Sequence, residues 1–299
     1  MKIVDIENQI IEKAAYSYVD KPERSNLLKI SNSPTELKQK NGYVYAPLLS
    51  DDFPDQIIGL NFRRHINGKS LYPVFIEDKE KADKLINNKM TTLKNMLDTL
   101  NDGYNILINN DGTKNTLSSD FFCAIKDQIT LISIHITTLQ KIKTLCASNI
   151  KKLKENEKLY ITGHGKKNYH ELGATQDVNS QTISVMTLID NLCKHNLSKR
   201  FNDIRINSCY SADIEIPESA HKDDLEKASN IVGEASFCEK MSELLFYKGF
   251  HSSVVTGYHG AGRTTGKFIH KTRLIANDDI RSSLVKKTFF ANAQFVNKK

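Results

Sequence analysis

Short hydrophobic runs alternate with longer stretches of helical periodicity over most of the chain. The short runs are rich in β-branched and aromatic residues and predict strands, whereas apolar positions three or four residues apart predict helices. The predicted strands are 57–62, 71–76, 103–109, 159–162, 203–207 and 252–257. The predicted helices are 78–100, 119–156 (as one long helix or a hairpin), 181–199 and 234–249.

The two ends of the chain show different patterns. Residues 4–18 can form an amphipathic helix, and residues 20–56 are polar, contain four prolines and predict an irregular segment. The last 40 residues alternate short β-like pieces with turns. We therefore expect an N-terminal helix and irregular extension over 1–56, an α/β core over 57–257 with a helical insertion near 113–157, and a basic C-terminal β-flap over 258–299.

The order of these elements predicts the fold class. Strands that alternate with helices form a mainly parallel sheet with helices on both faces, so we expect an α/β protein. In such sheets, reactive side chains gather where the strands end, at the carboxyl edge. The residues directly after each predicted strand are therefore the first candidates for chemistry.

Two of the predicted strands are followed by residues that can do covalent chemistry. His164 follows strand 159–162, and Cys209 follows strand 203–207. One predicted helix separates these strands, and adjacent strands of a sheet lie about 4.8 Å apart. A thiolate is a strong nucleophile, and a nearby imidazole can take up its proton. The spacing predicts a Cys209–His164 dyad; the alternative is a buried structural cysteine and an ordinary glycine-rich turn.

Glycines next to the histidine add a second feature of such a site. The backbone N–H groups of Gly165 and Cys209 could form an oxyanion hole for a substrate carbonyl. A third catalytic residue beside Cys209 and His164 is less evident. Asp111, in the turn after strand 103–109, is the candidate, and Asp102 and Asp120 compete with it.

The runs that carry these residues resemble a known group of enzymes. LYITGHGKKNY at 159–169, DIRINSCYSAD at 203–213 and the 45-residue spacing between His164 and Cys209 resemble the caspase-like cysteine peptidases. Within that group, the sequence is most similar to the self-processing cysteine protease domains of large bacterial toxins. The run YHGAGR at 258–263 resembles the flap of those domains.

The resemblance implies a caspase-like fold and a cysteine endopeptidase with a protein substrate. It implies Cys209 as nucleophile and His164 as acid and base, with no cofactor required for the chemistry, and it raises the prospect of self-cleavage. It also implies activation by inositol hexakisphosphate bound to the basic flap. The strand expected to line the pocket for the residue before the cut is Val254, Val255, Thr256, Gly257 and Tyr258. This strand contains no acid, so a basic residue before the cut is disfavoured.

The distribution of charge agrees with an anionic ligand. Residues 257–299 contain nine Lys and Arg but only two Asp, so this segment accounts for the whole net charge of +7. Such a cluster points to a polyanion, or is simply a solvated basic edge. The expected polyphosphate contacts are Arg63, Arg64, Arg263, Lys267, Lys271, Arg273, Lys286 and Lys287.

Composition argues against several classes of protein. No apolar run reaches the roughly 18 residues that span a membrane, and acidic residues near the N-terminus replace the apolar centre of a Sec-type signal. The five cysteines form no CxxC pair, and no metal-ligand spacing occurs. We expect no nucleic-acid partner, and either a cytoplasmic location or delivery into a host cytosol as a bacterial effector. The rival hypothesis is a polyanion-binding protein that has this fold but does not use the dyad.

Overall fold

The computed structural model describes residues 41–109, 118–177, 179–263 and 272–291. The chain divides into two compact units. The larger unit comprises Lys40–Met90 and Thr137–Lys299, and the other includes Thr91–Ile136.

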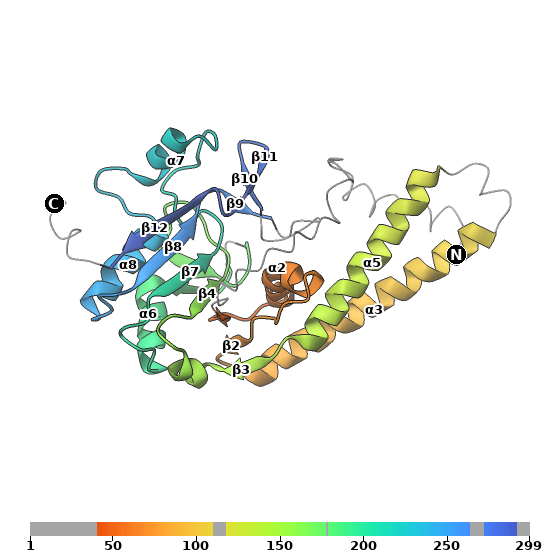
Figure 1. The fold of residues 1–299 in the computed structure, drawn as a ribbon, viewed down its shortest axis with the longest axis horizontal. Coiled ribbons are helices and arrows are strands. Elements are labelled where there is room, and N and C mark those ends of the chain that lie inside the picture. The colour runs from red at the N-terminus through yellow and green to blue at the C-terminus, as the bar shows by residue number, and fades with distance from the viewer. Residues whose placement is uncertain (1–40, 110–117, 178, 264–271, 292–299) are drawn as a thin grey trace, which may run out of the picture. The chain divides into compact units, whose positions relative to one another are not determined.

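A seven-stranded sheet forms the centre of the larger unit (Figure 1). Its strands lie in the order β12-β8-β7-β4-β1-β2-β3, and all neighbours are parallel except β12 and β8. The strands are β1 (Gly42–Ala46), β2 (Val74–Ile76), β3 (Thr144–Cys146), β4 (Lys158–Thr162), β7 (Asp203–Asn207), β8 (Val254–Tyr258) and β12 (Lys286–Phe290). The mostly parallel sheet confirms the predicted α/β class.

Helices cover both faces of this sheet (Figure 1). They are α2 (Phe53–Ile66), α6 (Val185–Lys194) and α8 (Phe237–Tyr247). Leu188 of α6 and Met241 of α8 share one hydrophobic core with Ile161 of β4. On the opposite face, the Thr162 hydroxyl donates a hydrogen bond to Oε1 of Gln56 in α2 at 2.9 Å. The core therefore lies in two layers, with the sheet between α2 and the α6–α8 pair.

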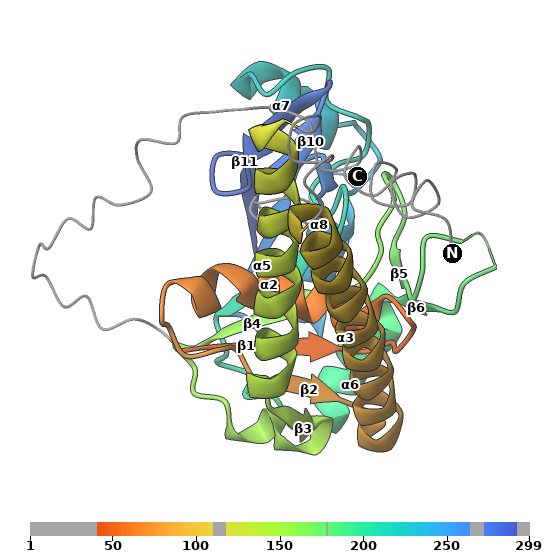
Figure 2. The same cartoon turned by 90° about the vertical axis from the view of Figure 1, so that its right-hand side faces the viewer.

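Smaller elements complete this unit. They are β5 (Glu171–Gly173) and β6 (Thr182–Ser184), which pair as a hairpin, the 3-10 helix η1 (Ala147–Lys152) and α7 (Lys222–Ser229). The antiparallel strands β9 (Ala261–Gly262), β10 (Thr272–Ile275) and β11 (Asp278–Arg281) form what we call the flap sheet. Leu225, Ile275 and Val285 pack together, so α7 lies against the flap sheet (Figure 2).

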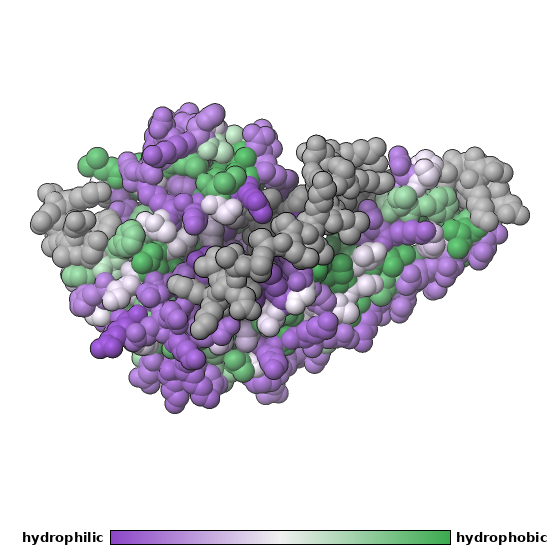
Figure 3. Space-filling model, in the orientation of Figure 1, coloured by the Kyte–Doolittle hydropathy of each residue, from purple (hydrophilic) through white to green (hydrophobic). Residues whose placement is uncertain are grey.

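The described part of the second unit is helical. It belongs to α3 (Lys79–Asn109) and α5 (Ser119–Lys141), which lie side by side in Figure 2. Leu107 and Ile125 are buried between them, and the rings of Tyr104 and Phe122 meet edge to face at 6.1 Å. Hydrophilic residues line the outer side of α3 in Figure 3, as expected for an amphipathic helix.

Two predicted strands are helical instead. The segment 57–62 lies in α2, where Phe53, Ile57 and Phe62 are buried on one side of the helix and Pro54 occupies its first turn. The segment 103–109 forms the end of α3, and its buried residues are four apart rather than two. Both runs are short and apolar, and such runs do not distinguish a strand from one turn of a buried helix.

One strand was missed by the sequence prediction. Residues 20–56 were predicted to be irregular, but Gly42–Ala46 forms β1, which pairs with β4 on one side and β2 on the other. The prolines around this run hid a five-residue strand that ends directly before Pro47. The core sheet therefore begins before residue 57, and the helix predicted at 4–18 lies outside the described residues.

Other predicted elements are close to those observed. The strands at 159–162, 203–207 and 252–257 are confirmed as β4, β7 and β8, and the helix at 78–100 as the first part of α3. The segment 119–156 is a helix only as far as Lys141, and β3 and η1 follow it. Within the described residues, no helix is both long and apolar enough to cross a membrane.

The central position of β1 in the sheet can be tested by measuring how a substitution in this strand changes the stability of the protein. Val44 is fully buried in this strand, and removal of two methyl groups from a packed core costs roughly 2–3 kcal/mol. Val44→Ala should therefore lower the free energy of unfolding by that amount in urea denaturation. Val232→Ala, at a fully exposed valine, is the matched control and should change it by less than about 0.5 kcal/mol. Equal small effects would contradict the assignment of β1 to the core.

Candidate active site

The predicted dyad residues lie at the carboxyl ends of two adjacent strands. β4 and β7 are parallel neighbours, and Thr162 pairs with Asn207 at their last positions. His164 and Cys209 follow these positions and line one small cleft of about 30 Å³, which has room for about one water molecule. The residues that line this cleft are Gln56, Thr162, Gly163, His164, Gln176, Asn207, Ser208, Cys209, Gly262 and Arg273.

The turn that carries Cys209 has an unusual backbone. Tyr210 has a φ of 52°, which a bulky side chain rarely adopts, and such strain often marks a functional turn. The turn is held by the Tyr210 N–H, which donates to the Gly260 carbonyl at 2.9 Å. The Gly262 N–H in turn donates to Sγ of Cys209 at 3.3 Å. The sulfur is thus fixed against the start of the flap sheet.

Gly165 lies directly against the nucleophile turn. A Cβ atom at this position would be 2.4 Å from the Cys209 carbonyl oxygen and 2.9 Å from Oγ of Ser208, so only glycine fits. Among the described residues, neither the Gly165 nor the Cys209 N–H donates a hydrogen bond. An oxyanion hole requires backbone donors that are free to bind a substrate oxygen, and these two N–H groups remain candidates for it.

The histidine is held by its backbone and by a carboxylate. His164 exchanges two backbone hydrogen bonds with Gly173, at 2.9 and 2.8 Å. Its Nε2 lies 3.1 Å from Oδ2 of Asp52 at the N-terminus of α2, although the contact is not aligned as a hydrogen bond. Burial lowers the pKa of His164, and the Asp52 carboxylate opposes this effect. The imidazole is therefore largely neutral at pH 7 and able to accept a proton.

Asp52 is a candidate site residue that the sequence reasoning missed. The candidate Asp111 lies outside the described residues, and its competitors Asp102 and Asp120 lie in α3 and at the start of α5. The signal for Asp52 was the sequence Asp-Phe-Pro, which is typical of the first residues of a helix. The helix was not predicted there, so its N-terminal aspartate was not considered.

Unpartnered polar atoms are concentrated in the cleft. Four buried side-chain atoms there make no hydrogen bond: Nδ2 of Asn207, Oγ of Ser208, Nε of Arg273 and Nε2 of His164. Of these, Nε2 of His164 lies close to the Asp52 carboxylate. Buried polar groups are normally satisfied, so a cluster of exceptions indicates a place where a ligand or water binds. Two of these atoms can only donate, which suits a group rich in oxygen acceptors.

The strand predicted to line the substrate pocket lies inside the sheet. β8 is flanked by β7 and β12, and Val255, Thr256 and Tyr258 are buried. Gly257 has no room for a side chain, because a Cβ atom would lie 2.6 Å from Sγ of Cys238. None of Val254–Tyr258 is among the residues that line the small cleft. Their predicted role toward a substrate remains a prediction.

Several predicted polyphosphate contacts already have partners. Arg263 makes two hydrogen bonds to Asp279, at 2.8 and 3.1 Å. Nζ of Lys287 is shared among Glu226, Ser229 and Asn230. These side chains would have to exchange an internal partner for a ligand.

Other side chains predicted to contact polyphosphate lie in different parts of the structure. Arg273 is 2% exposed and reaches into the cleft instead of the surface, a correction of the predicted surface contact. Arg64 donates to the Ser70 carbonyl and lies over the Tyr72 ring. Lys286 is exposed, and Lys267 and Lys271 lie outside the described residues. The polyphosphate site expected from the sequence therefore remains a prediction.

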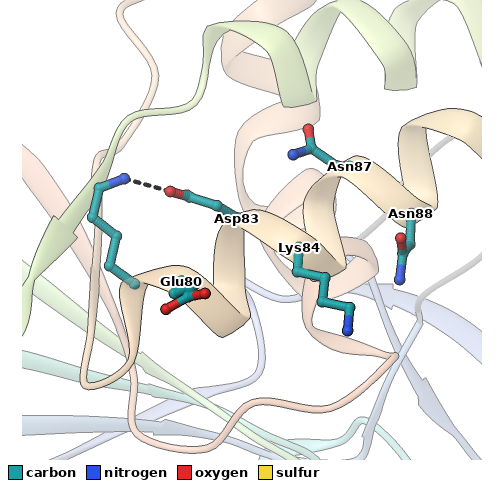
Figure 4. A pocket seen from close by; sticks show the side chains of 6 residues that line it. Glu80, Asp83, Lys84, Asn87 and Asn88 are labelled. Carbon is teal, nitrogen blue, oxygen red and sulfur yellow. Dashed lines mark hydrogen bonds and ion pairs between the residues drawn. The ribbon is translucent and has the colours of Figure 1, made fainter.

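A larger hollow, of about 590 Å³, lies elsewhere (Figure 4). It lies along the first turns of α3, where Lys79 and Asp83 form an ion pair. Its other lining residues are Glu80, Lys84, Asn87 and Asn88. They point outward from one helix face, and none is a nucleophile. Among the described residues, no group of three or more His, Cys, Asp or Glu side chains is placed to hold a metal ion.

Comparisons with known proteins assign no family to the chain. No family model and no curated protein matches it. A search of solved structures gives glucose-6-phosphate 1-dehydrogenase from Mycobacterium avium, with a TM-score of 0.27 and 8% sequence identity. The match covers 58% of this chain and 30% of that enzyme, a likeness too small to support any argument.

The contact between Asp52 and His164 can be tested by titration. The Asp52 carboxylate favours the charged imidazolium, so Asp52→Asn should lower the pKa of His164 further, by about 0.5 to 1 pH unit. NMR titration of the imidazole protons, with His164→Gln to assign the signal, measures this. Asp51→Asn, at the exposed neighbouring aspartate, is the control and should leave the titration unchanged. A pKa that rises or stays constant in Asp52→Asn would show that the contact is absent in solution.

Proposed function

We propose that this protein is a cysteine endopeptidase of caspase-like fold. The single observation that supports this best is the cleft at the ends of β4 and β7, which His164 and Cys209 both line. The same residues carry the resemblance of the sequence to caspase-like peptidases. The proposed substrate is a protein, and all five cysteines are free thiols, which suits work in a cytosol of its own cell or of a host.

In the proposed reaction, Cys209 attacks the carbonyl carbon of the scissile bond. The N–H groups of Gly165 and Cys209 stabilise the negative oxygen that forms. His164 accepts the thiol proton and delivers it to the leaving amine, and Asp52 holds the imidazole in place. Water then releases the acyl group from the sulfur, with His164 again as base.

The charge of the cleft agrees with the expected specificity. Arg273 brings a positive charge to the cleft, and its lining residues include no Asp or Glu. A lysine or arginine before the cut would be repelled there, whereas neutral or acidic residues would not. The sequence Leu48-Leu49-Ser50 is the candidate for self-cleavage, since it offers an apolar residue before the bond. Leu49 is buried, and Ser50 donates to the Ala174 carbonyl at 2.6 Å. Cleavage there would need local opening of the chain.

Site-selective labelling and peptide cleavage test the proposal. An electrophilic peptide probe should label wild type and Cys193→Ala, whose sulfur lies outside the cleft, but not Cys209→Ala. His164→Ala should fold normally and cleave a peptide library 10²–10⁴-fold more slowly, because the proton acceptor is lost. Equal labelling of the two cysteine variants, or full cleavage by folded His164→Ala, would refute the proposal.

We also propose that inositol hexakisphosphate activates the enzyme by binding beside α2 and the flap sheet. Burial and the nearby positive charge of Arg281 both lower the pKa of Arg63, so two arginines from separate elements share one region. Phosphate forms strong charge-assisted bonds with arginine, so one compact polyphosphate could bind both side chains. We propose Arg63 and Arg281 together with the wider set of contacts expected from the sequence.

A thermal-shift titration with inositol hexakisphosphate tests this site. The melting temperature should rise at low salt, and the rise should shrink as salt increases, because the contacts are ionic. Arg63→Met with Arg281→Met should abolish most of the rise. Arg200→Met, at an exposed arginine before β7, should preserve it. If the double variant is stabilised as much as wild type, the ligand binds elsewhere.

A further inference from the structure

Arg273 is a deeply buried charged side chain that lines the cleft. It extends from β10 of the flap sheet to the nucleophile turn, where its Nη1 donates to the Ser208 carbonyl at 2.8 Å. Nη2 donates to Oδ1 of Asn207 at 3.3 Å, and the guanidinium lies 4.7 Å from the centre of the Tyr258 ring. One strand of the flap sheet is thus joined by a side chain to the two residues before Cys209.

The guanidinium also lies close to the sulfur. A Cβ atom at Gly262 would be 3.1 Å from Nη1 of Arg273 and 3.9 Å from Sγ of Cys209, so these two atoms are at most about 7 Å apart. Gly262 has no side chain, so nothing from this residue stands between the charge and the sulfur. Burial removes the water that would screen their interaction.

Among the described residues, the positive charge of Arg273 forms no ion pair, although the Asp213 carboxylate attracts it. Burial lowers the pKa of Arg273, yet a guanidinium stays protonated at neutral pH. No carboxylate among the described residues forms an ion pair with it. A buried and unpaired charge is costly, so a nearby group that can become negative is favoured.

Of the acidic groups around Arg273, two stay neutral: burial raises the pKa of both Tyr258 and Cys238. The Asp213 carboxylate attracts the guanidinium, but its hydrogen bonds are to the His259 imidazole at 2.5 Å and the Gly260 N–H at 2.7 Å. The other acidic group that acts on Arg273 is the thiol of Cys209.

The other titratable groups that face Cys209 do not replace this role. Burial lowers the pKa of His164 at the end of β4, so its ring is largely neutral at pH 7, and Asp52 acts through that ring. Burial raises the pKa of Tyr210, which stays protonated. Arg273 is therefore the lasting positive charge of the cleft.

We propose that Arg273 is a positioning residue that holds the nucleophile turn from the flap sheet and serves as counter-ion for the Cys209 thiolate. This inference rests on the proposed role of Cys209 as nucleophile. When the thiol ionises, its proton passes to solvent or to His164, and the negative sulfur gains the attraction of the buried guanidinium. One side chain makes both contacts, so β10 holds the turn of Cys209 and carries this charge at the same time.

The test measures ionisation of Cys209 without any need for peptide cleavage. The full-length protein is alkylated with iodoacetamide between pH 5.5 and 9.5, and peptide mapping by mass spectrometry gives the rate at Cys209 alone. In Arg273→Met the midpoint of the rate profile should move upward by about one pH unit or more, with a roughly tenfold slower rate at pH 7. Arg273→Lys keeps the charge and should restore most of the rate.

Matched controls separate this effect from a change of fold. Arg200→Met should leave the Cys209 profile unchanged, and alkylation of Cys193 should be the same in every variant. If Arg273→Met does not fold, Arg273→Gln, which can still donate to the Ser208 carbonyl, carries the same expectation. An unchanged midpoint in a folded, uncharged variant would overturn the proposal. A shifted midpoint in a protein that cleaves no peptide would support it and refute the peptidase instead.

Discussion

The parallel pairing of β4 with β7 is the constraint on which the rest of the site depends. The two strands end level, at Thr162 and Asn207, so the segments that follow emerge side by side from the same edge of the sheet. A slip of one residue in this register would turn the alternate side chains of β7 to the other face and withdraw Cys209 from His164. The α6 and α8 helices hold the register by packing against Ile161 and Ile206 of the two strands. Chemistry at the cleft is therefore a consequence of core packing.

The second determinant is the close approach of three separate backbone segments. Gly165, Cys209 and Gly262 come from different parts of the chain, and side chains at the two glycine positions would contact neighbouring groups at 3.1 Å or less. Such approach excludes solvent and leaves polar atoms of Asn207, Ser208 and Arg273 without partners. The protein can fold despite these unsatisfied polar atoms because the surrounding hydrophobic core is large. The unsatisfied donors are then free to engage a bound group.

The sequence predicted the elements that carry the dyad more accurately than those that support it. β4 and β7 are marked by β-branched and aromatic residues next to polar turns, and this pattern is enough to pair His164 with Cys209. β1 and α2 were not found, because their signals are short and lie among prolines that suggested a loop. Asp52 was missed with α2. The interior position of Arg273 could not be predicted either, since a single arginine in a basic segment carries no sign of burial.

The position of β1 in the sheet has a consequence for how the chain folds. This strand lies between β2 and β4, yet β4 follows it by 116 residues, with the whole of α3 and α5 in between. Contacts so distant along the chain form slowly, since a long loop must close before any stabilising interaction is gained. β1 is the earliest strand of this sheet to be synthesised, but it can join only after the later strands are available. Until then the sheet that brings Cys209 and His164 to one cleft is incomplete.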